Sequence, residues 1–119
     1  MSKFVQTDYG NKKQILKFPD HYVNVAITVD NVGVTANSDG KKIVPAGTIM
    51  GGGVLADPSV LAKKSNDENA EGVLFNDVDV THGPASGALL IHGFIDLKKL
   101  PEAPDAAAVG ALKQITFIA

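Results

Sequence analysis

Apolar and polar residues alternate along most of the chain with the two-residue period that is typical of β-strands. The period is clearest over residues 22–29, where valine or isoleucine occupies every second position from Val23 to Val29. Shorter apolar runs follow, bounded by glycine, proline, asparagine or aspartate. These runs predict further strands at residues 32–36, 43–44, 48–50, 72–80, 88–97 and 115–118.

The segment ALLIHGFIDL, residues 88–97, predicts the most strongly patterned strand of the second half. Its odd positions carry Leu89, Ile91, Ile95 and Leu97, which are expected to face the core. The even positions are mixed, so the opposite face is expected to lie partly in water or in an interface. Gly93 interrupts the run and predicts a bulge or a close backbone approach.

Turn signals separate the strands. NSDG at residues 37–40 predicts a tight turn, and Pro45-Ala46-Gly47 suits a type I turn. Polar loops are expected at residues 65–69 and 81–87. One short helix is expected to start at Asp57-Pro58 and a second to cover residues 106–112 with Asp105 as its cap. Many short strands with one or two short helices predict a mainly β fold, a small barrel-like domain.

The first twenty residues show no sustained strand or helix period. Their apolar residues are scattered and include three aromatics, which are costly to leave in water. We therefore divide the chain into an N-terminal arm, residues 1–20, that orders against a partner, and a single β-rich domain, residues 21–119. The expected contact residues of the arm are Phe4, Val5, Tyr9, Ile15, Leu16 and Phe18.

Composition narrows the classes of function. The 119 residues contain no cysteine, which excludes a disulfide framework, and a net charge of −2 without any arginine argues against nucleic-acid binding. The longest apolar run, ALLI, is too short to cross a bilayer, and the polar N-terminus does not suit a signal peptide. We therefore expect a soluble protein, made in the cytoplasm, with neither nucleic acid nor a membrane as partner.

Residues 72–96 hold side chains that are common in active sites. Asp77, Asp79, His82 and His92 are possible metal ligands, but they lack the paired spacing of zinc sites. Ser86 stands off-centre in GPASG and does not fit a nucleophile elbow. GGGVLA at residues 51–56 formally fits a dinucleotide-binding pattern, without the long strand and following helix that the pattern requires. We therefore expect no catalytic residue, no metal and no cofactor. A small hydrolase or metal enzyme using His82, His92 and Asp79 remains an alternative.

The order of several segments carries a family resemblance. IVPAGTIMGG is similar to the Ala-Gly-Thr-apolar-apolar-Gly segment of lambda-type bacteriophage head decoration proteins. GVLFNDVDVTHGPASGALLIHGFIDLKKL resembles the second half of that family, with Asp-Val-Asp, a small-residue loop and an apolar strand with an internal glycine. ALKQITFI resembles its C-terminal helix and strand. The resemblance covers residues 40–119.

This resemblance implies a small barrel-like (β-tulip) fold and a non-enzymatic function. It implies a homotrimer that binds the phage major capsid protein at three-fold positions, outside the expanded head, and stabilises the virion. It also implies an N-terminal arm that adds a strand to the capsid surface, and synthesis in the bacterial host's cytoplasm. His92 and Phe94, on the mixed face of the strand at 88–97, are our candidates for the subunit contact. The alternative is a β-barrel adaptor or host-surface-binding module of a phage tail or neck.

Overall fold

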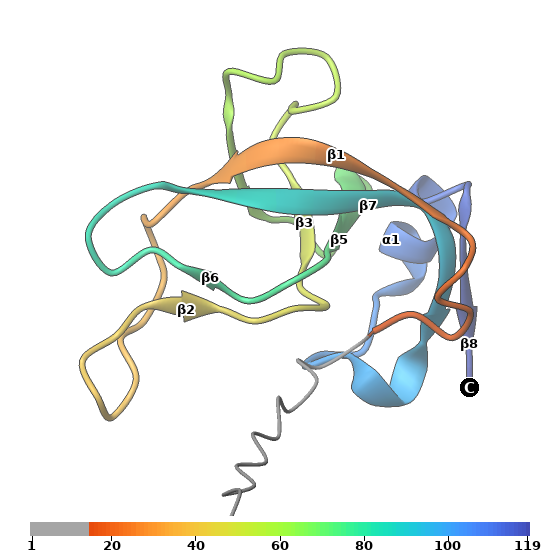
Figure 1. Cartoon of the computed structure of the whole chain (residues 1–119). Coiled ribbons are helices and arrows are strands. Elements are labelled where there is room, and N and C mark those ends of the chain that lie inside the picture. The colour runs from red at the N-terminus through yellow and green to blue at the C-terminus, as the bar shows by residue number, and fades with distance from the viewer. Residues whose placement is uncertain (1–14) are drawn as a thin grey trace, which may run out of the picture.

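The computed structural model describes residues 15–119 (Figure 1). These residues form eight β-strands, one 3-10 helix and one α-helix. In chain order the elements are β1 (Tyr22–Val29), β2 (Ile43–Val44), β3 (Ile49–Gly51), β4 (Leu61–Lys64), β5 (Ala70–Leu74), β6 (Val78–Asp79), β7 (Ala85–Asp96), η1 (Leu97–Lys99), α1 (Ala106–Ala111) and β8 (Ile115–Ile118). No helix in this part of the chain is long and apolar enough to span a membrane.

Five strands close into a small mixed barrel. Their order is β1-β4-β3-β5-β7, and pairing of β1 with β7 completes the ring. The β1–β4 pair is parallel, and the other pairs of the ring are antiparallel. Outside the ring, β8 runs parallel to β7, while β2 and β6 form a separate two-stranded sheet. The prediction of a mainly β, barrel-like domain is thus confirmed.

Strand β7 belongs to two parts of the structure. Its first part, Ala85–His92, pairs with β1, and its last four residues, Gly93–Asp96, pair with β8 (Figure 1). Val23 is opposite His92, but the next residue of β1 is opposite Leu90, so Ile91 is the extra residue of a β-bulge. Gly93 follows with a φ of +157°, a value near the edge of the region that favours glycine. The predicted bulge is therefore confirmed.

On three strands, two adjacent apolar residues belong to different hydrophobic clusters. Because side chains alternate between the faces of a strand, Met50, Leu74 and Leu89 enter one cluster and the adjacent residues Ile49, Val73 and Leu90 enter the other. The first cluster fills the barrel between β1 and β6, and the second packs under α1 and β8. The even face of residues 88–97 is partly exposed at Ala88, His92, Phe94 and Asp96, as expected, but Leu90 on the same face is fully buried.

Two predicted elements are absent from the described residues. Residues 32–36 form no strand, and Asp57 begins no helix. The Asp57 carboxylate instead accepts hydrogen bonds from the Ser59 N–H and hydroxyl, which closes a short turn. The chain then pairs with β1 as β4, with Leu61 opposite Thr28, so strand pairing overrides the local helix signal.

The turn before β3 starts one residue later than predicted. The Thr48 N–H donates to the Pro45 carbonyl at 3.2 Å, which makes Gly47 the third residue of the turn. Gly47 has a φ of +92°, as a type II turn requires at that position. The helix at the C-terminal end follows the prediction: the Asp105 carboxylate accepts from the Ala107 N–H and caps α1, and β8 follows.

The start of the described chain is part of the folded body. Ile15 and Leu16 are 0% and 5% exposed and belong to the cluster under α1 and β8. Backbone bonds attach them to β7: the Asp96 N–H donates to the Ile15 carbonyl at 2.9 Å, and the Lys17 N–H donates to the Phe94 carbonyl at 2.8 Å. The assignment of Ile15 and Leu16 to a capsid-binding arm is therefore corrected, because their apolar surface is already buried within the protomer. An arm has to end before residue 15.

Candidate interaction surface

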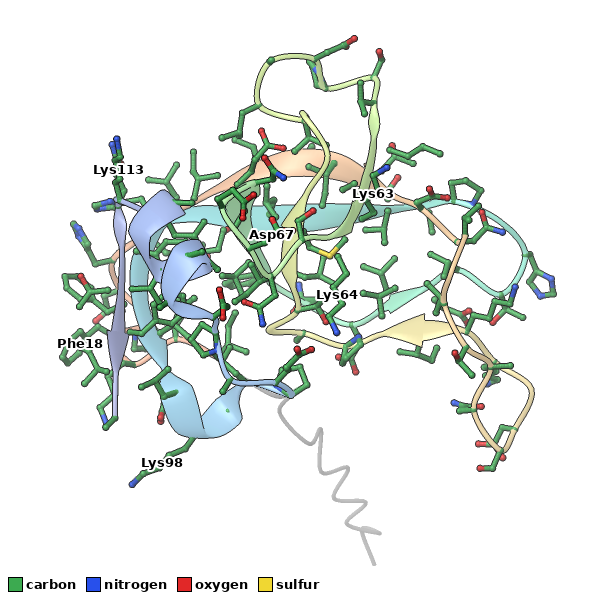
Figure 2. The ribbon with its side chains drawn as sticks, turned by 180° about the vertical axis from the view of Figure 1, so that it is seen from behind. Phe18, Lys63, Lys64, Asp67, Lys98 and Lys113 are labelled. Carbon is green, nitrogen blue, oxygen red and sulfur yellow. The ribbon has the colours of Figure 1, made fainter. Side chains whose placement is uncertain are left out.

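Aromatic residues gather where the N-terminal segment crosses β7. Phe18, Tyr22 and Val23 are 50%, 44% and 49% exposed there. Figure 2 shows Phe18 at the outer edge of the molecule, beside β8. We call this region the aromatic surface, and it consists of Phe18, His21, Tyr22, Val23, Phe75, His92 and Phe94.

Backbone pairing places these rings. The bond from Lys17 to Phe94 sets Phe18 next to Phe94, and the two rings meet edge to face with their centroids 5.3 Å apart. Tyr22 lies opposite Gly93 across the β1–β7 ladder and stacks on Phe75 at 5.1 Å. A Cβ at residue 93 would meet the His21 carbonyl oxygen and the Tyr22 Cβ at ordinary contact distances of 3.4 and 3.5 Å, so it is the positive φ rather than lack of space that favours glycine there. Aromatic pairs of this kind add about 0.5–1.5 kcal/mol beyond the area that they bury.

A pair of histidines lies at the centre of the aromatic surface. The Nε2 atoms of His21 and His92 are 3.0 Å apart, and the ring planes cross at 67°. His21 is exposed, whereas His92 is half-buried and its Nδ1 atom is shielded from solvent without a hydrogen-bond partner. His92 was expected as a subunit contact or as part of the enzyme alternative, and nothing in the sequence marks His21 as its partner. The two residues are 71 positions apart, and only the β1–β7 register brings them together.

The predicted contact residues fall into four groups. Phe4, Val5 and Tyr9 lie outside the described residues, and Ile15 and Leu16 are in the core. Phe18 is half-exposed, as an arm contact needs. His92 and Phe94 are half-buried, and the N-terminal segment of the same chain covers them through His21 and Phe18. Part of each side chain thus remains at the surface, and a role in a subunit contact stays a prediction.

The residues of the enzyme alternative do not converge. Asp77 accepts from the Ala46 N–H at 2.7 Å, Asp79 binds Thr81, and His82 is exposed in the loop before β7. Among residues 15–119, no three histidines, aspartates or glutamates form a group that could hold a metal ion. Ser86 lies on β7 opposite Thr28. These positions explain the polar residues of this stretch through turn and strand structure.

The glycine-rich segment GGGVLA has an unexpected internal partner. The backbone N–H groups of Gly53, Val54 and Leu55 all donate to the carboxylate of Glu71, at 2.6, 2.9 and 3.1 Å. Successive amides that point at one anion form the kind of nest that binds phosphate in other proteins. Here the protein's own β5 side chain fills the nest, so the segment does not offer it to a nucleotide.

A cavity of about 300 Å³ lies between β2, β3 and the chain that follows β1. Its wall is mostly aliphatic, with Val29, Val44 and Met50 at its base, and Lys64 and Glu102 form an ion pair at its rim. The Lys64 ammonium, followed by the Asn66 amide, holds the pKa of the Glu102 carboxyl below its ordinary value. The rim charges therefore neutralise one another, and the cavity favours no charged ligand.

Comparison with known proteins adds no family assignment. No protein-family model matches the chain, and the search of curated proteins found no match. The fold, the aromatic surface and the order of the sequence motifs are therefore the basis for a functional proposal.

Proposed function

We propose that this chain is a non-enzymatic bacteriophage head decoration protein that binds the exterior of the expanded capsid and stabilises it against genome pressure. One observation supports the proposal: the segments that resemble the lambda-type family fall, in the order of that family, on strands of a small domain built around a β-barrel. IVPAGTIMGG covers β2, the turn at Gly47 and β3. The segment from residue 72 to residue 100 covers most of β5 and then β6, β7 and η1, and ALKQITFI ends in β8.

The partner in this proposal is the major capsid protein of the phage. Residues 1–14 form the arm, with Phe4, Val5 and Tyr9 as its apolar contacts. An arm that adds a strand to the capsid surface gains affinity through main-chain hydrogen bonds, while its side chains fill pockets. Three arms on one trimer raise the effective concentration of each, by about 10²–10⁴ in favourable geometry.

The aromatic surface is the proposed contact between subunits of a homotrimer. Phe18 and Val23 expose apolar area on the side of the half-buried Phe94 and His92, because Phe18 meets the Phe94 ring and Val23 is opposite His92 on β7. Such a contact would bury side chains that are costly to leave in water. The proposed location is the outer surface of the virion, after synthesis in the cytoplasm of the bacterial host.

Co-sedimentation with expanded, undecorated heads of the cognate phage tests the proposal. The full chain is compared with a chain that lacks residues 1–14; the deletion stops there because Ile15 and Leu16 are core residues. A triple variant, Phe4→Ala, Val5→Ala and Tyr9→Ala, tests the arm contacts, and Val32→Ala, at a site 77% exposed in the loop after β1, is the matched control.

We expect the full chain and Val32→Ala to saturate the heads at a fixed ratio, and the deletion and the triple variant to bind at least tenfold more weakly. If the full chain does not bind, the decoration function is wrong, and co-sedimentation with purified tails then tests the adaptor alternative. Saturating binding by the deletion would assign the contact to the barrel and remove the arm from the proposal.

A further inference from the structure

The distance between His21 and His92 restricts where their protons can be. Two ring nitrogens at 3.0 Å attract each other only if one carries a hydrogen and the other offers a lone pair. When both Nε2 atoms carry hydrogens, the two N–H groups face each other and repel. The contact therefore exists only in particular protonation states of the pair.

The buried Nδ1 of His92 selects one of these states. This atom has no partner among the described residues, and a buried N–H without an acceptor costs about 1–3 kcal/mol. The favoured arrangement keeps the hydrogen of His92 on Nε2, which donates to the bare Nε2 of His21. The hydrogen of His21 is then on Nδ1, on an exposed ring that water can solvate.

Adding a proton breaks this arrangement. A proton on Nε2 of His21 removes the acceptor, and the bond can re-form only if His92 moves its hydrogen to the buried, partnerless Nδ1. The charged groups on the surrounding elements are Lys17 and Asp20 on the N-terminal segment, Asp96 on β7 and Lys113 before β8, with Tyr22 on β1 also able to titrate. In the described chain, none of these groups has a hydrogen bond or ion pair with either ring that would offset the added charge.

We propose that His21 and His92 form a pH-sensitive clasp that holds the N-terminal segment, residues 15–21, against β7 when both rings are neutral and weakens as they take up protons. Because the contact needs one Nε2 without a hydrogen, a fall in pH that adds hydrogens to both rings favours opening. Histidine changes charge between about pH 5 and 8, which sets the range of the effect. The clasp concerns the protein itself and does not rest on the proposed function.

Two backbone amides report on the clasp directly. The Lys17 and Asp96 N–H groups bond across the junction of the segment and β7, so their hydrogen-exchange protection measures local opening. The Val80 N–H, which donates to the Lys42 carbonyl at 2.8 Å beside the separate β2–β6 sheet, is an internal reference, because the Val80 side chain belongs to the other hydrophobic cluster. Protection factors correct for the intrinsic pH dependence of exchange.

We expect the protection factors of Lys17 and Asp96 to fall by at least about tenfold between pH 8 and pH 5.5. This is within the limit set by linkage, which is a tenfold change per pH unit for each proton taken up on opening. Val80 is expected to keep its protection. The double variant His21→Gln and His92→Gln retains an amide donor and acceptor but has no ring to titrate, so its protection should change less than twofold. His82→Gln, at the remaining histidine of the chain, should behave as the parent protein.

Nitrogen-15 NMR of the histidine rings in the unmodified protein gives a second test that does not depend on a variant. At pH 8, His92 should carry its hydrogen on Nε2 and His21 on Nδ1. Finding the hydrogen of His92 on Nδ1 would overturn the clasp. Constant protection across the pH range, or an equal loss in the double glutamine variant, would overturn it as well.

Discussion

Gly72 on β5 lies directly against Leu89 on β7, so that a Cβ at residue 72 would stand 2.6 Å from the Leu89 Cγ and equally close to the Leu90 carbonyl oxygen. Both leucines are fully buried, and the carbonyl belongs to the strand, so neither has room to move. We predict that Gly72→Ala lowers the free energy of unfolding by about 1–3 kcal/mol, as overpacking typically does. Urea denaturation measures the change.

Gly110 provides the matched control for that substitution. It lies in α1 with a negative φ, and a Cβ there would meet open space. Gly110→Ala should raise the free energy of unfolding by about 0.5–1 kcal/mol, because alanine loses less backbone entropy in a helix. Equal destabilisation by both substitutions would show that close packing at Gly72 is not the cause.

The carboxylate of Glu71 should be important for the stability of the loop after β3. Removing it in Glu71→Ala leaves the N–H groups of Gly53, Val54 and Leu55 without their acceptor, and Val54 is buried. We predict a loss of about 1–3 kcal/mol in the free energy of unfolding. Glu68→Ala, at an exposed position of the adjacent loop, should change it by less than about 0.5 kcal/mol. Thermal unfolding of the three proteins decides.

Ile15 and Phe18 are three residues apart but should respond differently to truncation. Ile15→Ala empties part of a closed cluster and should cost about 2–5 kcal/mol. Phe18→Ala removes a half-exposed ring with one edge-to-face partner and should cost about 1 kcal/mol. Denaturant unfolding gives both values. If Ile15→Ala costs no more than Phe18→Ala, residues 15–16 are not part of the body in solution.

We predict that the hydrogen bonds to Asp79 make the stability of the fold depend on pH in the acid range. The hydroxyl of Thr81, followed by its N–H, donates to the Asp79 carboxylate and holds its pKa below the ordinary value. A carboxyl group whose pKa is lower in the folded state stabilises the fold at pH values above its pKa in the unfolded chain, which is about 4. This contribution is lost as the pH falls through the pKa of the group in the folded state. Thr81→Ala should raise the pKa of Asp79 toward the ordinary value of an aspartate, and Thr81→Ser should leave it lowered. Carboxyl carbon NMR during an acid titration measures the three values.

Local patterns in the sequence predicted the elements whose partners are close in the chain. The alternation over residues 22–29 predicted β1, Asp105 predicted the cap of α1, and Gly93 predicted the bulge of β7. In each case the deciding interaction is local, or the pattern repeats over enough residues to fix the exposed face. The order of the strands in the barrel could not be predicted in this way.

What the sequence could not predict depends on contacts between distant residues. The segment at Asp57 has a helix-start signal, but pairing of Leu61 with Thr28 on β1 makes it a strand. His21 and His92 are 71 positions apart in the sequence. Glu71 is 16 to 18 positions from the three amides that it binds. No local pattern marks either residue of such a pair. Leu90 was assigned to a mixed face, because the sequence of the strand does not show that α1 and β8 cover this face with a second hydrophobic cluster.

Both ends of the described chain are attached to the last residues of β7. Ile95 lies opposite Leu16 on one side and opposite Phe117 on the other. Neighbouring strands are about 4.8 Å apart, so the first and last segments of the body are separated by roughly 10 Å. A cargo protein fused after Ala119 would therefore emerge close to Ile15, where the described chain begins, unless a linker carries the cargo away. The same closeness makes the chain a candidate for circular permutation, with a short loop joining Ala119 to Ile15.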